Sequence, residues 1–234
     1  MSSSSSSSLP TPSGFSVLVS AATFKFNLAH FVAYKGFRER LHGHNYKLSI
    51  ELFGPRISSD GYVLDFGVVK SVCKAVCKSL NEHVIIPQKS DVLDVRDLEG
   101  KEDHVIVTCE DGCVFVFPKK DCYFAEIAHS TVEEISLMLY GRIMEGLGVG
   151  KLLGRGIDRV VIGLSEAPGQ ESTVEIPVVE GFDREEWERT GFNGFLKRGG
   201  GKVEFKGISC GRCGCQCGEG KGKGGGEGGE TGGS

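Results

Sequence analysis

The sequence predicts an α+β fold in which an antiparallel sheet carries two helices on one face. Three observations support this. Strand-like stretches of alternating polarity come in pairs, at 15–54 and at 158–178; two amphipathic helical patterns lie between these pairs; and a short hairpin signal separates the helices. The order is β-β-α-hairpin-α-β-β. Since both helices cover the same face, we expect further copies of the chain to cover the other.

The first two strands are predicted at residues 15–29 and 43–54. From Phe24 to Leu28 apolar and polar residues alternate, as they do in a strand with one buried face. The two strands are expected to pair as an antiparallel hairpin across the long loop 31–41.

Two helices are predicted from apolar residues at helical spacing. The stripes are Phe66, Val69, Val72, Cys73, Val76 and Leu80 in the first helix, and Ile135, Leu139, Ile143 and Leu147 in the second. Asp65 is a candidate N-cap for the first helix, which should end near Asn81. The second helix should begin at a capping box formed by Ser130 and Glu133.

The remaining elements are short strands. Apolar runs at 104–108 and 113–117 flank a Glu-Asp-Gly turn at 110–112, which predicts a hairpin between the helices. Two more strands are predicted at 158–166 and 172–178.

The chain is expected to contain one folded domain, residues 15–180. A disordered serine-rich leader, 1–14, precedes it, and an extension, 181–208, and a disordered tail, 209–234, follow it. Four cysteines crowd the tail: Cys210, Cys213, Cys215 and Cys217. They are either an accessory metal-binding or redox-sensitive cluster, or plain disordered sequence.

Bulk composition excludes several classes of protein. There are 27 basic and 31 acidic residues, a net charge of −4, so no nucleic-acid partner is expected. The sequence has no apolar run long enough to span a membrane, and its serine run lacks the features of a secretory signal. We therefore expect a cytoplasmic protein with reduced thiols, although the absence of acidic residues before Glu39 faintly resembles an organellar transit peptide.

The strongest functional signal is His42-Gly43-His44, at the start of the second strand. Side chains at i and i+2 of a strand share a face, so both imidazoles point to one place. His30, at the end of the partner strand, supplies a third ligand. Three histidines with an open fourth position are typical of a catalytic zinc site.

Several motifs occur in a particular order: Phe24–His30, His42-Gly43-His44-Asn45-Tyr46, Asp65-Phe66 with Lys70, Glu82-His83, Ser130-Thr131-Val132-Glu133, and Glu166. In this order, over roughly residues 15–178, the sequence resembles the 6-pyruvoyltetrahydropterin synthase and 6-carboxytetrahydropterin synthase family. The resemblance implies the tunnelling fold, a four-stranded antiparallel sheet with two helices on one face, here with an inserted hairpin. It also implies a homo-oligomer, commonly a hexamer, with active sites between subunits.

The resemblance also assigns roles to residues. His30, His42 and His44 would bind Zn²⁺, which would hold the side-chain hydroxyls of a small pterin substrate. Glu166 would anchor the pterin, because a carboxylate matches its two adjacent N–H donors, and Ser130 and Thr131 would contact it. As alternatives, Glu166 is a surface acid at a strand end, and Ser130 and Thr131 only cap a helix.

The sequence departs from the family in its catalytic base. The synthases carry a cysteine a few residues before the first histidine of the pair, whereas no cysteine here precedes Cys73. Glu39, in the pattern Glu-x-x-His-Gly-His, resembles a branch in which glutamate replaces that cysteine and the dihydroneopterin side chain is cleaved to give 6-hydroxymethyl-dihydropterin. The segment 87–127 also resembles this longer branch. The alternative is a solvated charge between Arg38 and Arg40.

A second departure is Glu82-His83 in place of the family's Asp-His pair. His83 would act as a general acid or base oriented by Glu82, or it would only help to cap the preceding helix.

The sequence thus predicts a zinc-dependent lyase of pterin biosynthesis, of the tetrahydrobiopterin or folate type, acting on dihydroneopterin triphosphate or on dihydroneopterin. The alternatives are side-chain cleavage through Glu39, a catalytically inactive homologue that binds zinc and pterin, and a metal-handling protein that works through its cysteine tail.

Overall fold

The computed structural model describes residues 14–55, 57 and 59–190, so the serine-rich leader and the cysteine tail lie outside the described part of the chain. Its main sheet contains four long strands: β1 (Phe15–His30), β4 (His42–Gly54), β10 (Arg159–Ala167) and β11 (Gln170–Pro177). They run antiparallel in the order β11-β10-β4-β1. The predicted α+β fold and its four central strands are confirmed.

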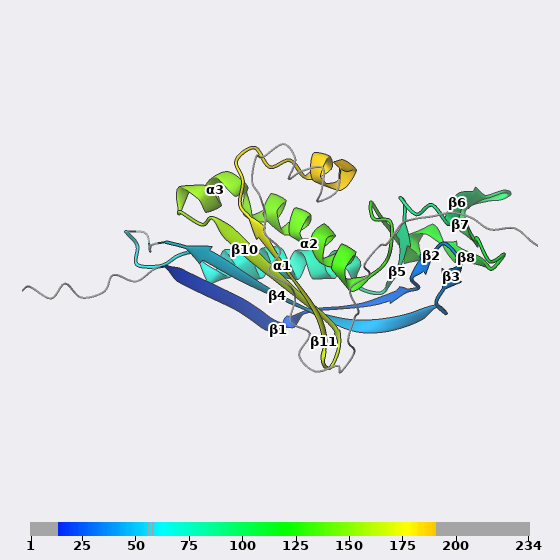
Figure 1. The fold of residues 1–234 in the computed structure, drawn as a ribbon, viewed down its shortest axis with the longest axis horizontal. Coiled ribbons are helices and arrows are strands. Elements are labelled where there is room, and N and C mark those ends of the chain that lie inside the picture. The colour runs from blue at the N-terminus through cyan, green and yellow to red at the C-terminus, as the bar shows by residue number, and fades with distance from the viewer. Residues whose placement is uncertain (1–13, 56, 58, 191–234) are drawn as a thin grey trace, which may run out of the picture. The chain divides into compact units, whose positions relative to one another are not determined.

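Three helices lie on one side of this sheet (Figure 1): α1 (Phe66–Leu80), α2 (Val132–Leu147) and the short α3 (Val149–Gly154). As predicted, Asp65 is the N-cap of α1, where its carboxylate accepts a hydrogen bond from the Gly67 amide at 2.7 Å. The predicted N-cap of α2 is one residue off: Thr131, and not Ser130, is the N-cap and accepts from the amide of Glu134, while the Glu134 carboxylate accepts from the amides of Ala128 and His129.

Two strands that the sequence did not predict extend the sheet beyond β1. β5 (His83–Pro87) and β9 (Cys122–Ala125) add in parallel, in the order β1-β5-β9. Both are short, and β5 reads as a continuous apolar run, which does not distinguish a buried parallel strand from other buried segments.

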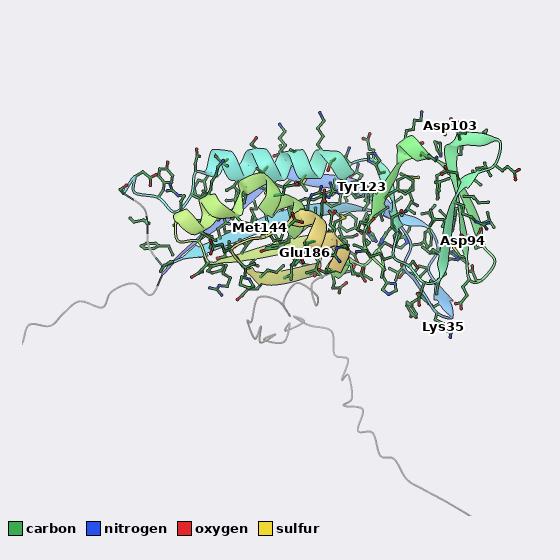
Figure 2. The ribbon with its side chains drawn as sticks, turned by 90° about the horizontal axis from the view of Figure 1, so that it is seen from above. Lys35, Asp94, Asp103, Tyr123, Met144 and Glu186 are labelled. Carbon is green, nitrogen blue, oxygen red and sulfur yellow. The ribbon has the colours of Figure 1, made fainter. Side chains whose placement is uncertain are left out.

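The predicted hairpin belongs to a separate three-stranded sheet, formed by β6 (Leu93–Leu98), β7 (Lys101–Cys109) and β8 (Val114–Pro118). We call it the inserted sheet. A 3₁₀ turn, η1 (Lys119–Asp121), leads from it to β9. The loop between β1 and β4 also contains a small ladder of β2 (Ala33–Tyr34) and β3 (Phe37–Arg38), and both views place this ladder beside the inserted sheet (Figures 1 and 2).

Close contacts between helices depend on two glycines of α2. A Cβ at Gly146 would lie 2.6 Å from the Val72 side chain of α1, and one at Gly141 would lie 2.7 Å from the ring of Trp187. Trp187 belongs to a helical stretch at 184–190, is 3% exposed, and donates a hydrogen bond to the Leu137 carbonyl. The chain just beyond β11 therefore packs on α2.

Among the described residues, no helix has the length and apolarity needed to cross a bilayer.

Candidate metal centre and active site

Three histidines meet at the junction of β1 and β4. In the antiparallel register His30 lies opposite His42, and Leu28 lies opposite His44. Residues opposite each other point to the same face, so the pairing brings in His30 while the two-residue spacing aligns His42 with His44. Their candidate ligand nitrogens all lie within 4.8 Å of one another. His30 is buried, His44 is half-buried and His42 is exposed.

Backbone carbonyls orient two of the rings. His30 Nδ1 lies 2.7 Å from the Ser130 carbonyl oxygen, and His42 Nδ1 lies 2.7 Å from that of Arg40. A carbonyl oxygen only accepts, so each Nδ1 donates and leaves Nε2 with a free lone pair. Burial, with smaller contributions from His42 and His44, lowers the pKa of His30 below its usual value despite the opposing Ser130 carbonyl. This favours the neutral imidazole that metal binding requires.

Tyr46 lies directly beside this cluster, two residues after His44 on the same strand face. It is fully buried, and its hydroxyl is 3.5 Å from His30 Nε2. Burial is the largest cause that raises the pKa of this phenol, and Glu166 and Glu39 raise it further. Both carboxylates therefore lie near one buried hydroxyl. Sequence reasoning treated Tyr46 only as part of a motif, although its spacing from His44 already placed it on the ligand face.

Glu39 follows β3 and is anchored to the chain just after β1. Its carboxylate accepts a hydrogen bond from the Val32 amide at 3.1 Å, and its own amide donates to the Val32 carbonyl at 2.9 Å. The side chain is half-buried. Glu166 approaches from β10, where the ladder with β11 is irregular between Ser165 and Ala167. Two carboxylates from distant parts of the sequence thus approach the three histidines.

Ser130 and Thr131 have structural roles in this arrangement. The Ser130 side chain is 0% exposed, and its hydroxyl donates to the Phe31 carbonyl at 2.7 Å while its own carbonyl holds His30. Thr131 caps α2. These contacts link the start of α2 to the end of β1, and the predicted contact of both residues with a pterin stays a prediction.

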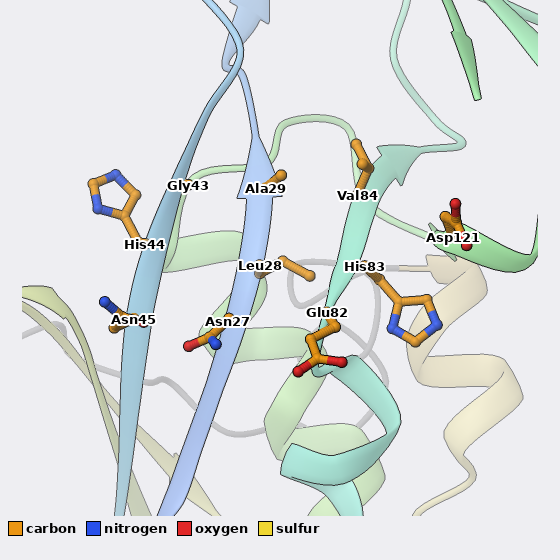
Figure 3. Close-up of a pocket in the computed structure, with 10 residues that line it drawn as sticks. All are labelled: Asn27, Leu28, Ala29, Gly43, His44, Asn45, Glu82, His83, Val84 and Asp121. Atoms are coloured by element: carbon orange, nitrogen blue, oxygen red, sulfur yellow. The ribbon is translucent and has the colours of Figure 1, made fainter. Parts of the chain in front are cut away.

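Glu82 and His83 lie apart from the histidine cluster within one chain. His83 is the first residue of β5 and Glu82 directly precedes it. β1 separates β5 from β4, and in Figure 3 the side chains of His44 and His83 project away from each other. Glu82 has a φ of 64°, a backbone conformation that is costly for a residue other than glycine. It is held there by a 2.7 Å hydrogen bond from its amide to the Asn27 carbonyl. Both residues line an open pocket on this part of the sheet.

Comparison with known proteins identifies the family. The family model for 6-pyruvoyl tetrahydropterin synthase matches residues 20–176. This chain belongs to the 6-pyruvoyl tetrahydropterin synthase family. The crystal structure of the Plasmodium vivax synthase is 41% identical, covers 70% of this chain and 99% of its own, and superposes with a TM-score of 0.68. The Plasmodium falciparum structure is 39% identical, covers 71% of this chain and 100% of its own, and has a TM-score of 0.68.

A curated relative from Methanocaldococcus jannaschii carries the provisional name 6-carboxy-5,6,7,8-tetrahydropterin synthase. It is 25% identical over 158 residues, which cover 64% of this chain and 88% of the relative. Two further structures of the Plasmodium vivax synthase carry an alanine or a cysteine in place of a glutamate that is described as a catalytic residue.

Family membership confirms the tunnelling fold and places the chain among the lyases of pterin biosynthesis. The inserted sheet, which is three-stranded where the sequence predicted a hairpin, is an addition to the four central strands. The three histidines fit a metal ion by their own chemistry, since two of them present a lone pair on Nε2 and their ligand atoms already converge.

Proposed function

We propose that this chain is a zinc-dependent lyase of a dihydroneopterin-type pterin, with His30, His42 and His44 as the metal ligands. The observation that carries the proposal is the convergence of three imidazoles and two carboxylates around the buried Tyr46. Three nitrogen ligands leave a fourth position for a substrate oxygen, the arrangement of catalytic zinc sites. When bound there, the ion would acidify a side-chain hydroxyl of the substrate.

Glu39 is the general base in this proposal. Glu39 lies three residues before His42 and near the buried Tyr46 hydroxyl, and no cysteine that could serve as the base precedes Cys73. The Val32 amide fixes the carboxylate. The glutamate described as catalytic in the Plasmodium vivax synthase supports this role, because that protein is 41% identical to this chain.

The reaction we propose is cleavage of the dihydroneopterin side chain to 6-hydroxymethyl-dihydropterin. Glu39 accepts the proton of a side-chain hydroxyl, whose carbon becomes a carbonyl as the adjacent carbon–carbon bond breaks. The electron pair of that bond passes into the pterin ring system, and the remaining carbon takes up a proton. The Glu39 carboxylic acid formed in the first step can return it, so that no oxidant or reductant is needed.

Glu166 is the proposed anchor of the pterin. It comes from β10, a strand other than those of the metal ligands, so it can hold one end of a flat ligand while the histidines face the other. A carboxylate accepts two parallel N–H···O bonds, which fix the ring plane as well as its position.

The proposed assembly is a homo-oligomer, a hexamer by resemblance to the family, with sites shared between copies. The sheet face opposite the helices is open in one chain, and Leu18 on β1 is 63% exposed. Glu82 and His83, which β1 separates from the histidine cluster, would reach the site of a neighbouring copy and act there as an acid–base pair.

A second candidate reaction is triphosphate elimination from dihydroneopterin triphosphate, which the family's description favours. The deciding measurement is product identity by mass spectrometry after incubation of the purified protein with dihydroneopterin and with its triphosphate. We expect 6-hydroxymethyl-dihydropterin and a two-carbon aldehyde. Release of triphosphate with a pyruvoyl product would overturn side-chain cleavage, and binding of zinc and pterin without turnover would identify an inactive homologue.

A further inference from the structure

The loop that carries Glu39 is attached to the inserted sheet through its neighbour in sequence, Arg38. Arg38 Nε donates to the Asp111 carboxylate at 2.7 Å, and Arg38 Nη1 donates to the backbone carbonyl of Glu39 at 2.8 Å. One guanidinium therefore bridges the turn of the inserted sheet and the backbone of the proposed base.

Further contacts hold this bridge in place. Asp111 accepts a second hydrogen bond, from the Cys113 amide at 3.0 Å, so its carboxylate is oriented before Arg38 meets it. The Arg38 guanidinium lies 5.7 Å from the centre of the Phe115 ring. The neighbouring Glu110 accepts from the Gly36 amide at 2.8 Å, which attaches the same loop at another point.

Aromatic stacking joins the base of the loop to the same sheet. The rings of Phe31 and Phe115 are stacked with centroids 4.9 Å apart. Phe31 directly follows the proposed metal ligand His30 in sequence. The inserted sheet therefore contacts this loop just after His30, through Phe31, and just before Glu39, through Arg38. Figures 1 and 2 show β2 and β3 lying along the inserted sheet.

The planar guanidinium of Arg38 can hold the Asp111 carboxylate and the Glu39 carbonyl at the same time. A guanidinium presents several N–H donors in one rigid plane and can bind a carboxylate and a carbonyl at once, whereas a lysine ammonium on a flexible stem fixes neither direction. The Arg38 side chain is 19% exposed and that of Asp111 is 45% exposed. Such a pair contributes little to global stability, because solvent screens it. Its effect should therefore appear in the position of Glu39 more than in the melting temperature.

We propose that Arg38 and Asp111 are positioning residues for Glu39, so that the inserted sheet sets the place of the catalytic base. The proposal rests on the function proposed above. It predicts that breaking the bridge lowers kcat while the substrate KM and the metal content stay nearly constant.

The test compares Arg38→Ala, Arg38→Lys, Asp111→Asn and the double variant Arg38→Ala/Asp111→Asn in the full-length protein. We expect kcat to fall on the order of tenfold to a hundredfold, because small displacements of a catalytic group have effects of this size. Arg38→Lys should rescue little, since it keeps the charge and loses the fork. The double variant should be no slower than Arg38→Ala, because the two residues act through one contact.

A readout independent of activity is amide hydrogen exchange. The Glu39 amide, which donates to the Val32 carbonyl, should exchange faster in Asp111→Asn than in the wild type. The matched control is Glu175→Gln, which breaks the exposed Arg159–Glu175 pair on β10 and β11 (2.9 Å) and should change neither kcat nor this exchange.

The outcomes separate this proposal from the proposed function. If Glu39→Gln abolishes turnover while the Arg38 and Asp111 variants keep wild-type kcat and wild-type exchange at Glu39, the positioning role is wrong and the function stands. If Glu39→Gln itself keeps full activity, the function assigned to Glu39 is wrong, and the exchange measurement alone decides whether the bridge orders the loop.

Discussion

Single hydrogen bonds set the tautomer and the ring orientation of two histidines in this site. His30 and His42 each donate from Nδ1 to a backbone carbonyl, of Ser130 and of Arg40. The first carbonyl lies at the start of α2 and the second in the loop before β4, so secondary structure far from β1 helps to fix ligand orientation. Such partners raise the basicity of a ligating imidazole and fix its tautomer.

At this scale the first prediction concerns Glu39. Glu39→Gln keeps the size of the side chain and removes the base, so kcat should fall by at least about 100-fold, the lower range for general acid–base catalysis. Zinc content, measured by atomic absorption, should not change, because Glu39 is not among the clustered histidine ligands. Glu185→Gln, an exposed glutamate distant in sequence, is the control. A variant that retains the wild-type rate would exclude Glu39 as the base.

At the scale of elements, α1 packs two thiols against the sheet. Cys73 and Cys77 are spaced i, i+4 on the buried face of the helix, and burial raises the pKa of each to about 12 from 9.0. Both thiols are therefore neutral in the folded protein at ordinary pH. A thiol that stays protonated in the folded state and ionises in the unfolded state makes stability depend on alkaline pH.

The second prediction follows from this difference. The folded state binds more protons between pH 9 and about 12, so the stabilisation is complete below pH 9 and is lost as pH rises through that window. By pH 10 each thiol should cost about 1 kcal/mol of unfolding free energy. Urea unfolding at pH 8 and pH 10 measures the loss. Cys73→Ala/Cys77→Ala should lower stability at pH 8 but flatten the pH dependence, and an unchanged slope would contradict the assignment.

At the scale of the whole molecule, the proposed sharing of sites between copies rests on the separation of His83 from the histidine cluster. β1 lies between β4 and β5 in the sheet, and His83 begins β5 directly after Glu82. An open sheet face on the side away from the helices offers a surface on which a second copy can pack. Symmetric assembly would repeat the same shared site at every equivalent interface.

Complementation tests this sharing. Glu39→Ala and His83→Ala should each be inactive alone, and co-expression should restore activity to about a quarter of the wild-type rate, because random mixing unites one intact residue from each copy at that fraction of shared sites. The amount of each variant in the purified assembly is measured by intact-mass spectrometry. If the mixed assembly is inactive while both variants are present in it, the two residues serve a site within one chain, and the proposed sharing is wrong.

Two elements, β1 and α1, could be predicted from the periodicity of polar and apolar residues along the chain. Alternation from Phe24 to Leu28 and the helical stripe from Asp65 to Leu80 repeat at the periods of a strand and a helix, and each was placed within a residue or two. β5 and β9 were missed, because short strands buried in parallel pairing leave no alternation to recognise. β6 was missed although it pairs antiparallel with β7, because Asp94, Arg96 and Asp97 leave few apolar residues in its sequence. The cap of α2 was misplaced by one residue, since Ser130 and Thr131 are both good caps and only the contact of Ser130 with Phe31 decides between them.

The sequence by itself determined that two histidines of β4 face one way and that a third stands at the end of β1, because spacing along a strand fixes the direction of side chains. Only the tertiary structure decided that the carboxylates of Glu39 and Glu166 both lie near the Tyr46 hydroxyl and that β1 separates His83 from the three histidines. It also decided that an inserted sheet holds the Glu39 loop through Arg38. Such arrangements depend on which strands pair and in what register, and no local period encodes those choices.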